Sequence, residues 1–161
     1  TGTTPGQADL QFILDPPRAQ SFQAATPTAL ADNVMTVLTW DANLYDSDGM
    51  WNAGQPTRLT VKTAGLYYCQ AMARVPIAGG VAASGTSIVT HSHWNTTIVP
   101  GTSGSLTANT SLSVRVAFEL VFAVNDYVEV FLRQKSGASR NTDNGSGGNV
   151  CGLSMRWVGY A

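Results

Sequence analysis

The amino-acid sequence predicts an all-β sandwich, and three observations support this prediction. The chain has 161 residues but only two lysines and two glutamates, although these residue types populate the exposed faces of helices. Between Leu112 and Leu120, apolar residues alternate strictly with polar or small ones, which is the period of a strand with one buried face. Turn signals separate such segments at regular spacing. We therefore expect a single domain of about eight to ten strands, arranged as a sandwich or jelly roll.

The N-terminal half is predicted to hold an arm and the first strands. Residues 1–17 have no stable period and end at Pro16-Pro17, which favours an extended arm or linker before a domain over residues 18–161. Strands are expected at 18–23 and 34–40. The segment 57–63 also alternates, and Ala64-Gly65 then leads into an aromatic-rich strand that runs to Val75. This pair of strands is predicted to be a β-hairpin.

The C-terminal half is predicted to contain further strands and two long loops. Two short strands are expected within residues 84–99, followed by a Ser/Gly/Thr-rich loop to Thr110. After the strand at 112–120, Asn125-Asp126 turns into a strand over 127–133. The segment 136–149 is rich in Gly, Ser and Asn and is expected to be an exposed loop, because it cannot bury apolar surface. A strand over 150–160 closes the chain.

Charge and cysteine content exclude some classes of function. The net charge is −1 and no basic cluster is present, so we expect no nucleic-acid binding. No apolar run is long enough to cross a bilayer, and the chain as given carries no recognisable export signal. Cys69 and Cys151 could pair, but two cysteines do not form a disulfide framework. We favour two buried, reduced thiols, since free cysteine behaves as a small hydrophobe.

The residues needed for catalysis are missing, so the chain is predicted not to be an enzyme. His91 and His93 are its only histidines, and neither a G-x-S-x-G nor an H-E-x-x-H motif occurs. Asp41, Asp46 and Asp48 could imitate the carboxylate pair of a glycosidase. Aspartates that hydrogen-bond their own turn are the commoner interpretation.

Four landmarks, in order along the chain, resemble the C1q/TNF-like jelly roll. The first strand ends in Phe22, and the Gly-hydrophobic-Tyr-aromatic signature appears at residues 65–68 as Gly-Leu-Tyr-Tyr. The penultimate strand follows a turn and reads Asn-Asp-Tyr-Val-Glu-Val at 125–130, and a last strand at 153–158 ends near the terminus. Within that family, the Asp-Gly-Met of residues 48–50, the Pro-x-Arg-Leu-Thr-Val of 56–61 and the Thr-Ala-Gly-x-Tyr of 63–67 look most like domains of bacteriophage fibres and other virion proteins.

This resemblance implies a homotrimer exposed on the head or tail of a virion. The arm of residues 1–17 would contact other virion proteins, and the domain would bind a glycan or protein of the host cell surface. The alternatives are a capsid decoration protein that stabilises the shell and a secreted C1q/TNF-like recognition domain. For the trimer interface we expect an apolar outer face that contains Tyr68, Met72 and Trp157.

Binding is assigned to the loops at 44–56, 101–110 and 136–149. Trp51 and Trp94 lie in or beside turns, where they could stack on a sugar or cap the sandwich. Asn52 in the first of these loops and Asn144 in the third are further candidate ligand-binding residues. Trp40 and Trp157 lie in strands and are expected in the core or in a subunit interface.

No cofactor is expected, but two sequence features could bind a metal ion. Asp46 and Asp48 have the oxygen ligands that calcium prefers, without the complete loop of an EF-hand. The simpler interpretation is an Asx turn. His91 and His93 alternate on a strand and would bring six imidazoles together near a threefold axis, although exposed histidines without a metal are the commoner case.

Overall fold

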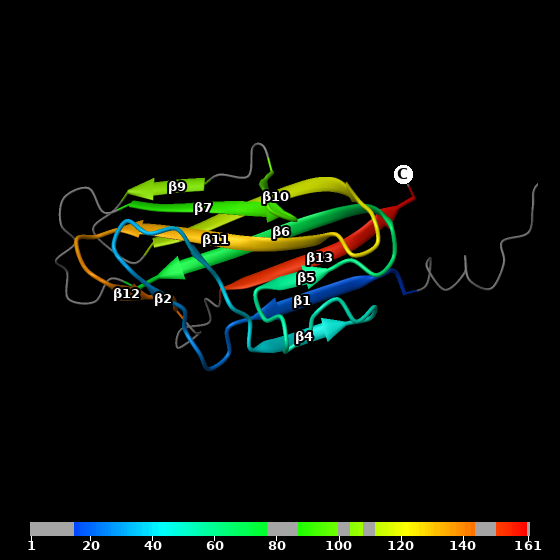
Figure 1. Cartoon of the computed structure of the whole chain (residues 1–161), viewed down its shortest axis with the longest axis horizontal. Helices are drawn as coiled ribbons and strands as arrows, with labels where there is room; N and C mark the ends of the chain where they lie inside the picture. The colour runs from blue at the N-terminus through cyan, green and yellow to red at the C-terminus, as the bar shows by residue number, and fades with distance from the viewer. Residues whose placement is uncertain (1–14, 77–86, 100–103, 108–111, 144–150, 161) are drawn as a thin grey trace, which may run out of the picture.

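Strands in two layers make up the molecule, as Figure 1 shows. The computed structural model describes residues 15–76, 87–99, 104–107, 112–143 and 151–160. Within these residues the chain forms no helix, and therefore none that is long and apolar enough to cross a membrane. The prediction of an all-β fold is confirmed.

The first layer is a five-stranded antiparallel sheet in which the first and last strands of the domain are neighbours. β6 and β10 pair along eleven residues each, so this ladder is the longest in the sheet. The order is β10 (Leu112–Phe122), β6 (Gly65–Val75), β13 (Gly152–Gly159), β1 (Arg18–Phe22) and β4 (Ala42–Asp46).

The second layer is built around one long strand, to which short strands pair at different positions. Its order is β3 (Thr36–Val37), β11 (Tyr127–Lys135), β7 (Ser87–Trp94) and β8 (Thr97–Ile98); β5 (Arg58–Thr60) also pairs with β11, and β9 (Gly104–Thr107) with β7. A two-stranded ribbon of β12 (Arg140–Asn141) and β2 (Ala29–Leu30) lies outside both sheets.

The core lies between the two layers because the inward residues of both are apolar. Along β6, buried and half-buried residues alternate without interruption over the whole strand. The inward side chains include Tyr67, whose ring meets that of Phe122 edge-on with centroids 5.8 Å apart. From the second layer, Leu59 of β5 and the β11 residues Val128, Val130 and Leu132 close the core. This is the period-two pattern expected of sheets with one buried face.

A buried polar cluster joins four segments next to the end of β1. Gln23 is fully buried, and its amide nitrogen donates to Thr28 Oγ1 (2.6 Å) and to the Thr39 carbonyl (3.0 Å). The hydroxyl of Thr142 donates to Gln23 Oε1 (2.6 Å) and accepts the Thr28 N–H (2.7 Å). The amide of Gln23 therefore has partners for both its donor and its acceptor, as burial of a polar group requires.

Both cysteines are free and buried, as predicted. Cys69 pairs with Met155, whereas Cys151 directly precedes Gly152, whose partner is Met72. The two thiols are therefore about four residues apart along the ladder, or roughly 13 Å. This separation is far beyond the range of a disulfide, in which the Cα atoms are at most about 7 Å apart.

The predicted hairpin of residues 57–75 is wrong, because β5 and β6 belong to different sheets. The Val61 N–H donates to the Asp126 carbonyl (2.8 Å), and the Asn125 N–H donates to the Val61 carbonyl (2.9 Å). These bonds hold the chain against the turn before β11, and it then crosses to the five-stranded sheet at Gly65. Local alternation and turn signals predicted strand, turn and strand, but they do not determine which strands pair.

Smaller differences concern the edges of the sheets. The strand predicted at 34–40 is reduced to Thr36–Val37. β4 was missed, and its last three residues overlap the predicted loop 44–56; its residues are exposed or half-buried and show no buried period. Likewise, β12 lies within the segment expected to be a loop, and β9 within the segment 101–110. Edge strands have one unpaired side, and their sequences show weak patterning.

The last residue of the predicted arm packs on the sandwich. Pro17 is buried, and its carbonyl accepts the Trp157 N–H at 2.8 Å. The arm residues 1–14 lie outside the described part of the chain.

Candidate binding groove

The acidic loop after β4 is closed by one carboxylate. Asp46 Oδ1 accepts the Met50 N–H (2.9 Å) and the Asp48 N–H (3.3 Å), and Asp46 Oδ2 accepts the Trp51 N–H (2.9 Å). Gly49 has φ of +65°, a left-handed conformation that glycine adopts at little cost. Asp46 thus makes the turn-type hydrogen bonds of the simpler sequence interpretation.

The calcium site stays a prediction. Both Asp46 oxygens accept backbone N–H groups, and burial raises the pKa of the Asp48 carboxyl, with the Asp46 charge adding to the effect and Thr63 and Lys62 opposing it. Within the described residues no group of three or more His, Cys, Asp or Glu side chains could hold a metal ion. A cation at this loop would have to compete with the bonds that close it.

The closed loop positions Trp51 beside β5. Met50 is buried, and its carbonyl accepts the Thr60 N–H at 2.8 Å. Trp51 makes an isolated bridge with Leu59, and its half-buried side chain packs against the core. Its indole Nε1 is buried without a hydrogen-bond partner. One apolar anchor and two backbone interactions therefore fix where the indole ring lies.

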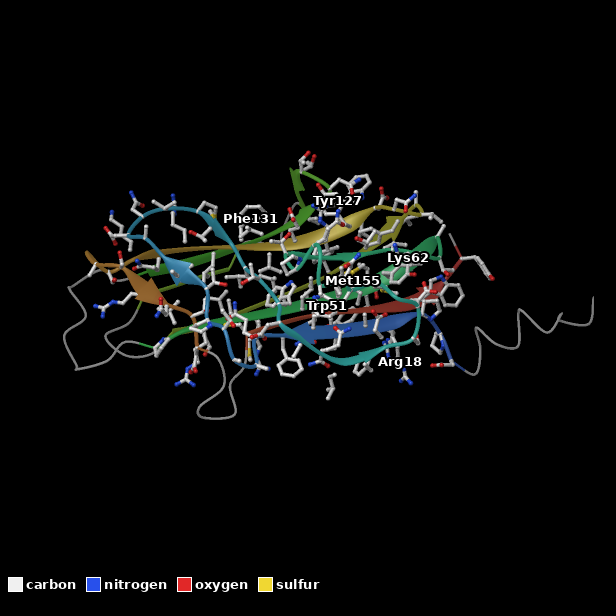
Figure 2. All side chains as sticks on the ribbon, turned by 60° about the horizontal axis from the view of Figure 1, so that its bottom comes forward. Arg18, Trp51, Lys62, Tyr127, Phe131 and Met155 are labelled. Carbon is white, nitrogen blue, oxygen red and sulfur yellow. The ribbon has the colours of Figure 1, made fainter. Side chains whose placement is uncertain are left out.

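An open groove of about 540 Å³ lies next to Trp51. It is formed by the segment 49–55, by β5 with the residue Lys62 beyond it, and by the start of β11 at Tyr127. Figure 2 labels Trp51, Lys62 and Tyr127, which come from these three segments. The lining also includes Arg58 and the amides of Asn52, Gln55 and Asn125, and contains no carboxylate side chain. This volume lies within the range of roughly 300 to 1,000 Å³ that is found for small-molecule sites.

Arg58 is held from two sides in this groove. Its guanidinium carbon lies 4.2 Å from the centroid of the Tyr127 ring, a cation–π contact. Its Nε lies 3.7 Å from Glu129 Oε1, and the same carboxylate oxygen accepts the Thr57 hydroxyl at 2.6 Å. Arg58 is paired with Glu129 through the register of β5 and β11, so the sheet itself brings the charged pair together.

Asn95 fixes the start of β11 from the neighbouring turn. Its Oδ1 accepts the Tyr127 N–H and its backbone N–H donates to the Tyr127 carbonyl, both at 2.9 Å. Its Nδ2 donates to Asp126 Oδ1 (2.9 Å). Burial works against the ionised form of Asp126, but hydrogen bonds from Asn95, Ala123 and Trp94 more than offset it, so the pKa of this carboxyl is lowered. Tyr127 therefore enters the groove from a fixed backbone.

The predicted ligand-binding residues are only partly brought together. Trp51 and Asn52 both line the groove. Trp94 is 37% exposed and pairs with Val128, which pairs with Leu59, the bridge partner of Trp51. The two tryptophans thus lie in one row across the sheet, three strand spacings or roughly 14 Å apart. Asn144 lies outside the described residues.

The remaining predicted sites are spread over both sheets. In β7, the backbone register pairs His91 with Phe131 and His93 with Glu129, whereas the histidine side chains lie outside the described part of the structure.

The site residues that sequence reasoning missed are Arg58, Lys62 and Tyr127. Their proximity depends on the pairing of β5 with β11, for which the local sequence carries no signal.

The three residues predicted for the trimer interface do not share one face. Tyr68 and Met72 alternate with the buried residues of β6 and are half-buried, so they lie on the face away from the core. Trp157 pairs with the inward residue Tyr67 and packs on the core. Its indole N–H donates to the Ala64 carbonyl (3.3 Å), and its ring meets Tyr160 edge-on at 5.0 Å.

Comparison with known proteins identifies the fold. No protein-family model and no curated protein sequence matches the chain. The globular domain of zebrafish complement 1qA protein is 15% identical, with a TM-score of 0.58, and the match covers 90% of this chain and 99% of that one. Murine APRIL at pH 8.5 is 10% identical, with a TM-score of 0.60 and coverage of 88% and 98%. A second structure of murine APRIL, at pH 8.0, is 13% identical, with a TM-score of 0.53 and coverage of 86% and 97%. The architecture is thus shared with these proteins across almost the whole of each.

Proposed function

From the premise that the chain has a C1q/TNF-like jelly-roll fold, we propose that it is a non-enzymatic recognition domain. It binds a glycan on a host cell surface through the groove beside Trp51, and it acts as a homotrimer on a bacteriophage particle. The groove carries this proposal, because it combines aromatic rings, amides and cations in one open site. The phage setting is supported by the sequence resemblance of residues 48–67, and residues 1–17 would join the domain to other virion proteins.

The binding of cells tests the recognition role. Labelled protein is expected to bind host cells in a saturable way, to be competed by unlabelled protein and to block phage adsorption. Trp51→Ala is expected to weaken this binding about tenfold or more, since stacking on an aromatic side chain is lost. The matched control is Trp94→Ala, which changes the tryptophan in the same row that does not line the groove. If wild-type protein at saturation left adsorption unchanged, the attachment role would be wrong and capsid decoration would be favoured.

The homotrimer is supported by the residues on the outer face of the five-stranded sheet, the face away from the core. Tyr68 and Met72 are half-buried there, and Arg18 lies over the ring of Tyr45 at 5.5 Å, so aromatic, thioether and guanidinium groups occur on one surface. Such residues are enriched at protein interfaces. Three linked copies of a weak site would also gain affinity through multivalency.

Light scattering in solution tests the oligomeric state. We expect a particle with the mass of three 17.0-kDa chains. A stable monomer at micromolar concentration would contradict the trimer without affecting the groove, because the groove is formed within one chain.

A further inference from the structure

The charge of the groove lining points to a more specific ligand. Arg58 and Lys62 both line the groove, whereas the carboxylates that interact with them, Glu129 with Arg58 and Asp48 with Lys62, are not part of its lining. The chain has only two lysines, and one of them, Lys62, is exposed at this groove. Carboxylates and phosphates are the groups that such a pair of cations attracts.

The geometry of Arg58 favours a planar anion. Tyr127 supports the face of the guanidinium, and Glu129 approaches it from the Nε side. Within the described residues its Nε is buried without a hydrogen-bond partner, and its side chain is 29% exposed where it lines the groove. A guanidinium held in this way can donate two parallel hydrogen bonds to a carboxylate with little loss of side-chain entropy.

The rest of the lining fits the ring and hydroxyls of a sugar. Trp51 lines the groove with a half-buried side chain, and the exposed part of its ring would pack against the apolar face of a pyranose. Asn52, Gln55 and Asn125 each supply a donor and an acceptor, which suits hydroxyl groups that also do both. The volume of about 540 Å³ accommodates one or two sugar residues.

We propose that the groove between Trp51, Arg58 and Lys62 binds an acidic sugar, whose carboxylate pairs with Arg58 and Lys62 while its ring packs on Trp51. This inference deepens the proposed recognition function and rests on it for the biological setting. It adds to that function that the bound sugar is negatively charged.

Titration of the intact protein with small sugars tests the inference. The probes are N-acetylneuraminate and D-glucuronate, with D-glucose as the neutral sugar and inorganic phosphate and acetate as anions without a sugar ring. Binding is followed by the chemical shifts of backbone and indole N–H groups. We expect both acidic sugars to bind about tenfold more tightly than glucose, phosphate or acetate, and the preference to decrease as salt concentration is raised.

Matched variants locate the charge that is responsible. Lys62→Gln is expected to reduce the affinity for the acidic sugars several-fold and to leave glucose unchanged. Lys135→Gln changes the only other lysine, which is also exposed and lies at the far end of β11. It should leave the affinities for the acidic sugars and for glucose unchanged. Arg58→Lys keeps the charge but loses the two parallel hydrogen bonds, so it should also lower the affinity for the acidic sugars.

The outcomes separate this inference from the proposed function. The proposal of an acidic sugar would be overturned if glucose or free phosphate bound as tightly as the acidic sugars. It would also be overturned if Lys62→Gln and Lys135→Gln had equal effects. Cell binding that persists without any binding of acidic sugars would overturn it too and would leave the recognition function standing. Conversely, if the protein bound acidic sugars tightly, with the expected variant pattern, and yet did not bind cells, this result would support the acidic-sugar site and would rule out the attachment role.

Discussion

Replacing Gly65 by alanine is expected to destabilise the domain by about 3 to 5 kcal/mol. Gly65 has φ of +149°, a conformation that residues with a side chain rarely adopt. An added Cβ would collide with Trp157 Nε1 and would lie 2.6 Å from the Gly159 carbonyl oxygen. Rotation of the indole could relieve the first contact, but it would break the hydrogen bond to Ala64, and the second contact is with backbone. The substitution therefore combines backbone strain with overpacking where the chain changes sheets.

Urea unfolding measures this effect, and Gly159→Ala is the matched control. Gly159 belongs to the same corner of the molecule, but an added Cβ there would meet no atom within 4 Å. We expect the control to stay within about 1 kcal/mol of wild type, whereas Gly65→Ala should lower the melting temperature by about 10 °C. A cost below 1 kcal/mol for Gly65→Ala would show that the corner can adjust and would contradict the packing described for Trp157.

Replacing Gln23 by leucine is expected to cost about 2 to 4 kcal/mol, because it leaves partners of the buried amide without hydrogen bonds. The Thr39 carbonyl and the Thr142 hydroxyl lose their bonds to Gln23, and Thr28 Oγ1 loses a donor. Leucine has a similar volume, so the expected loss comes from unsatisfied polar groups rather than from a cavity.

The same substitution at Gln20 separates polarity from shape. Gln20 lies in the same strand but is half-buried, on the face away from the core, and Gln20→Leu is expected to change the free energy of unfolding by less than about 1 kcal/mol. Chemical denaturation of both variants at one pH makes the comparison. Equal stabilities of the two variants would mean that the cluster around Gln23 contributes nothing beyond packing.

The sequence predicted strands well where one face is buried, and poorly where pairing is distant or the strand is at an edge. The alternation of residues 112–120 predicted most of β10, and Gly65 marked the start of β6. β4 escaped prediction because its exposed residues carry no period. The false hairpin had a different cause, because the pattern of residues 57–75 does not record that β5 pairs with β11, about 70 residues further along the chain.

The same limit explains which part of the groove could be predicted. Trp51 and Asn52 were identified because a tryptophan beside polar residues in a turn could stack on a sugar. Arg58 and Tyr127 looked like ordinary strand residues, and only the register that places Thr60 opposite Tyr127 brings them together. Trp157 was assigned to an outer face although its own alternation placed it with Leu153 and Met155, which are core residues.

The position of β1 in its sheet has a mechanical consequence. β1 is paired on both sides, with β13 and with β4, and Arg18 lies opposite Arg156 near the end of β13. A tether joined ahead of Asp15, pulled while the groove is held by a surface, would apply its force along β1. The backbone hydrogen bonds of both ladders would then share the force and would have to break together. The same force applied between Arg18 and Gly159 would instead open the β1–β13 ladder one bond at a time, so the domain is expected to unfold at a lower force in that direction than when it is pulled along β1.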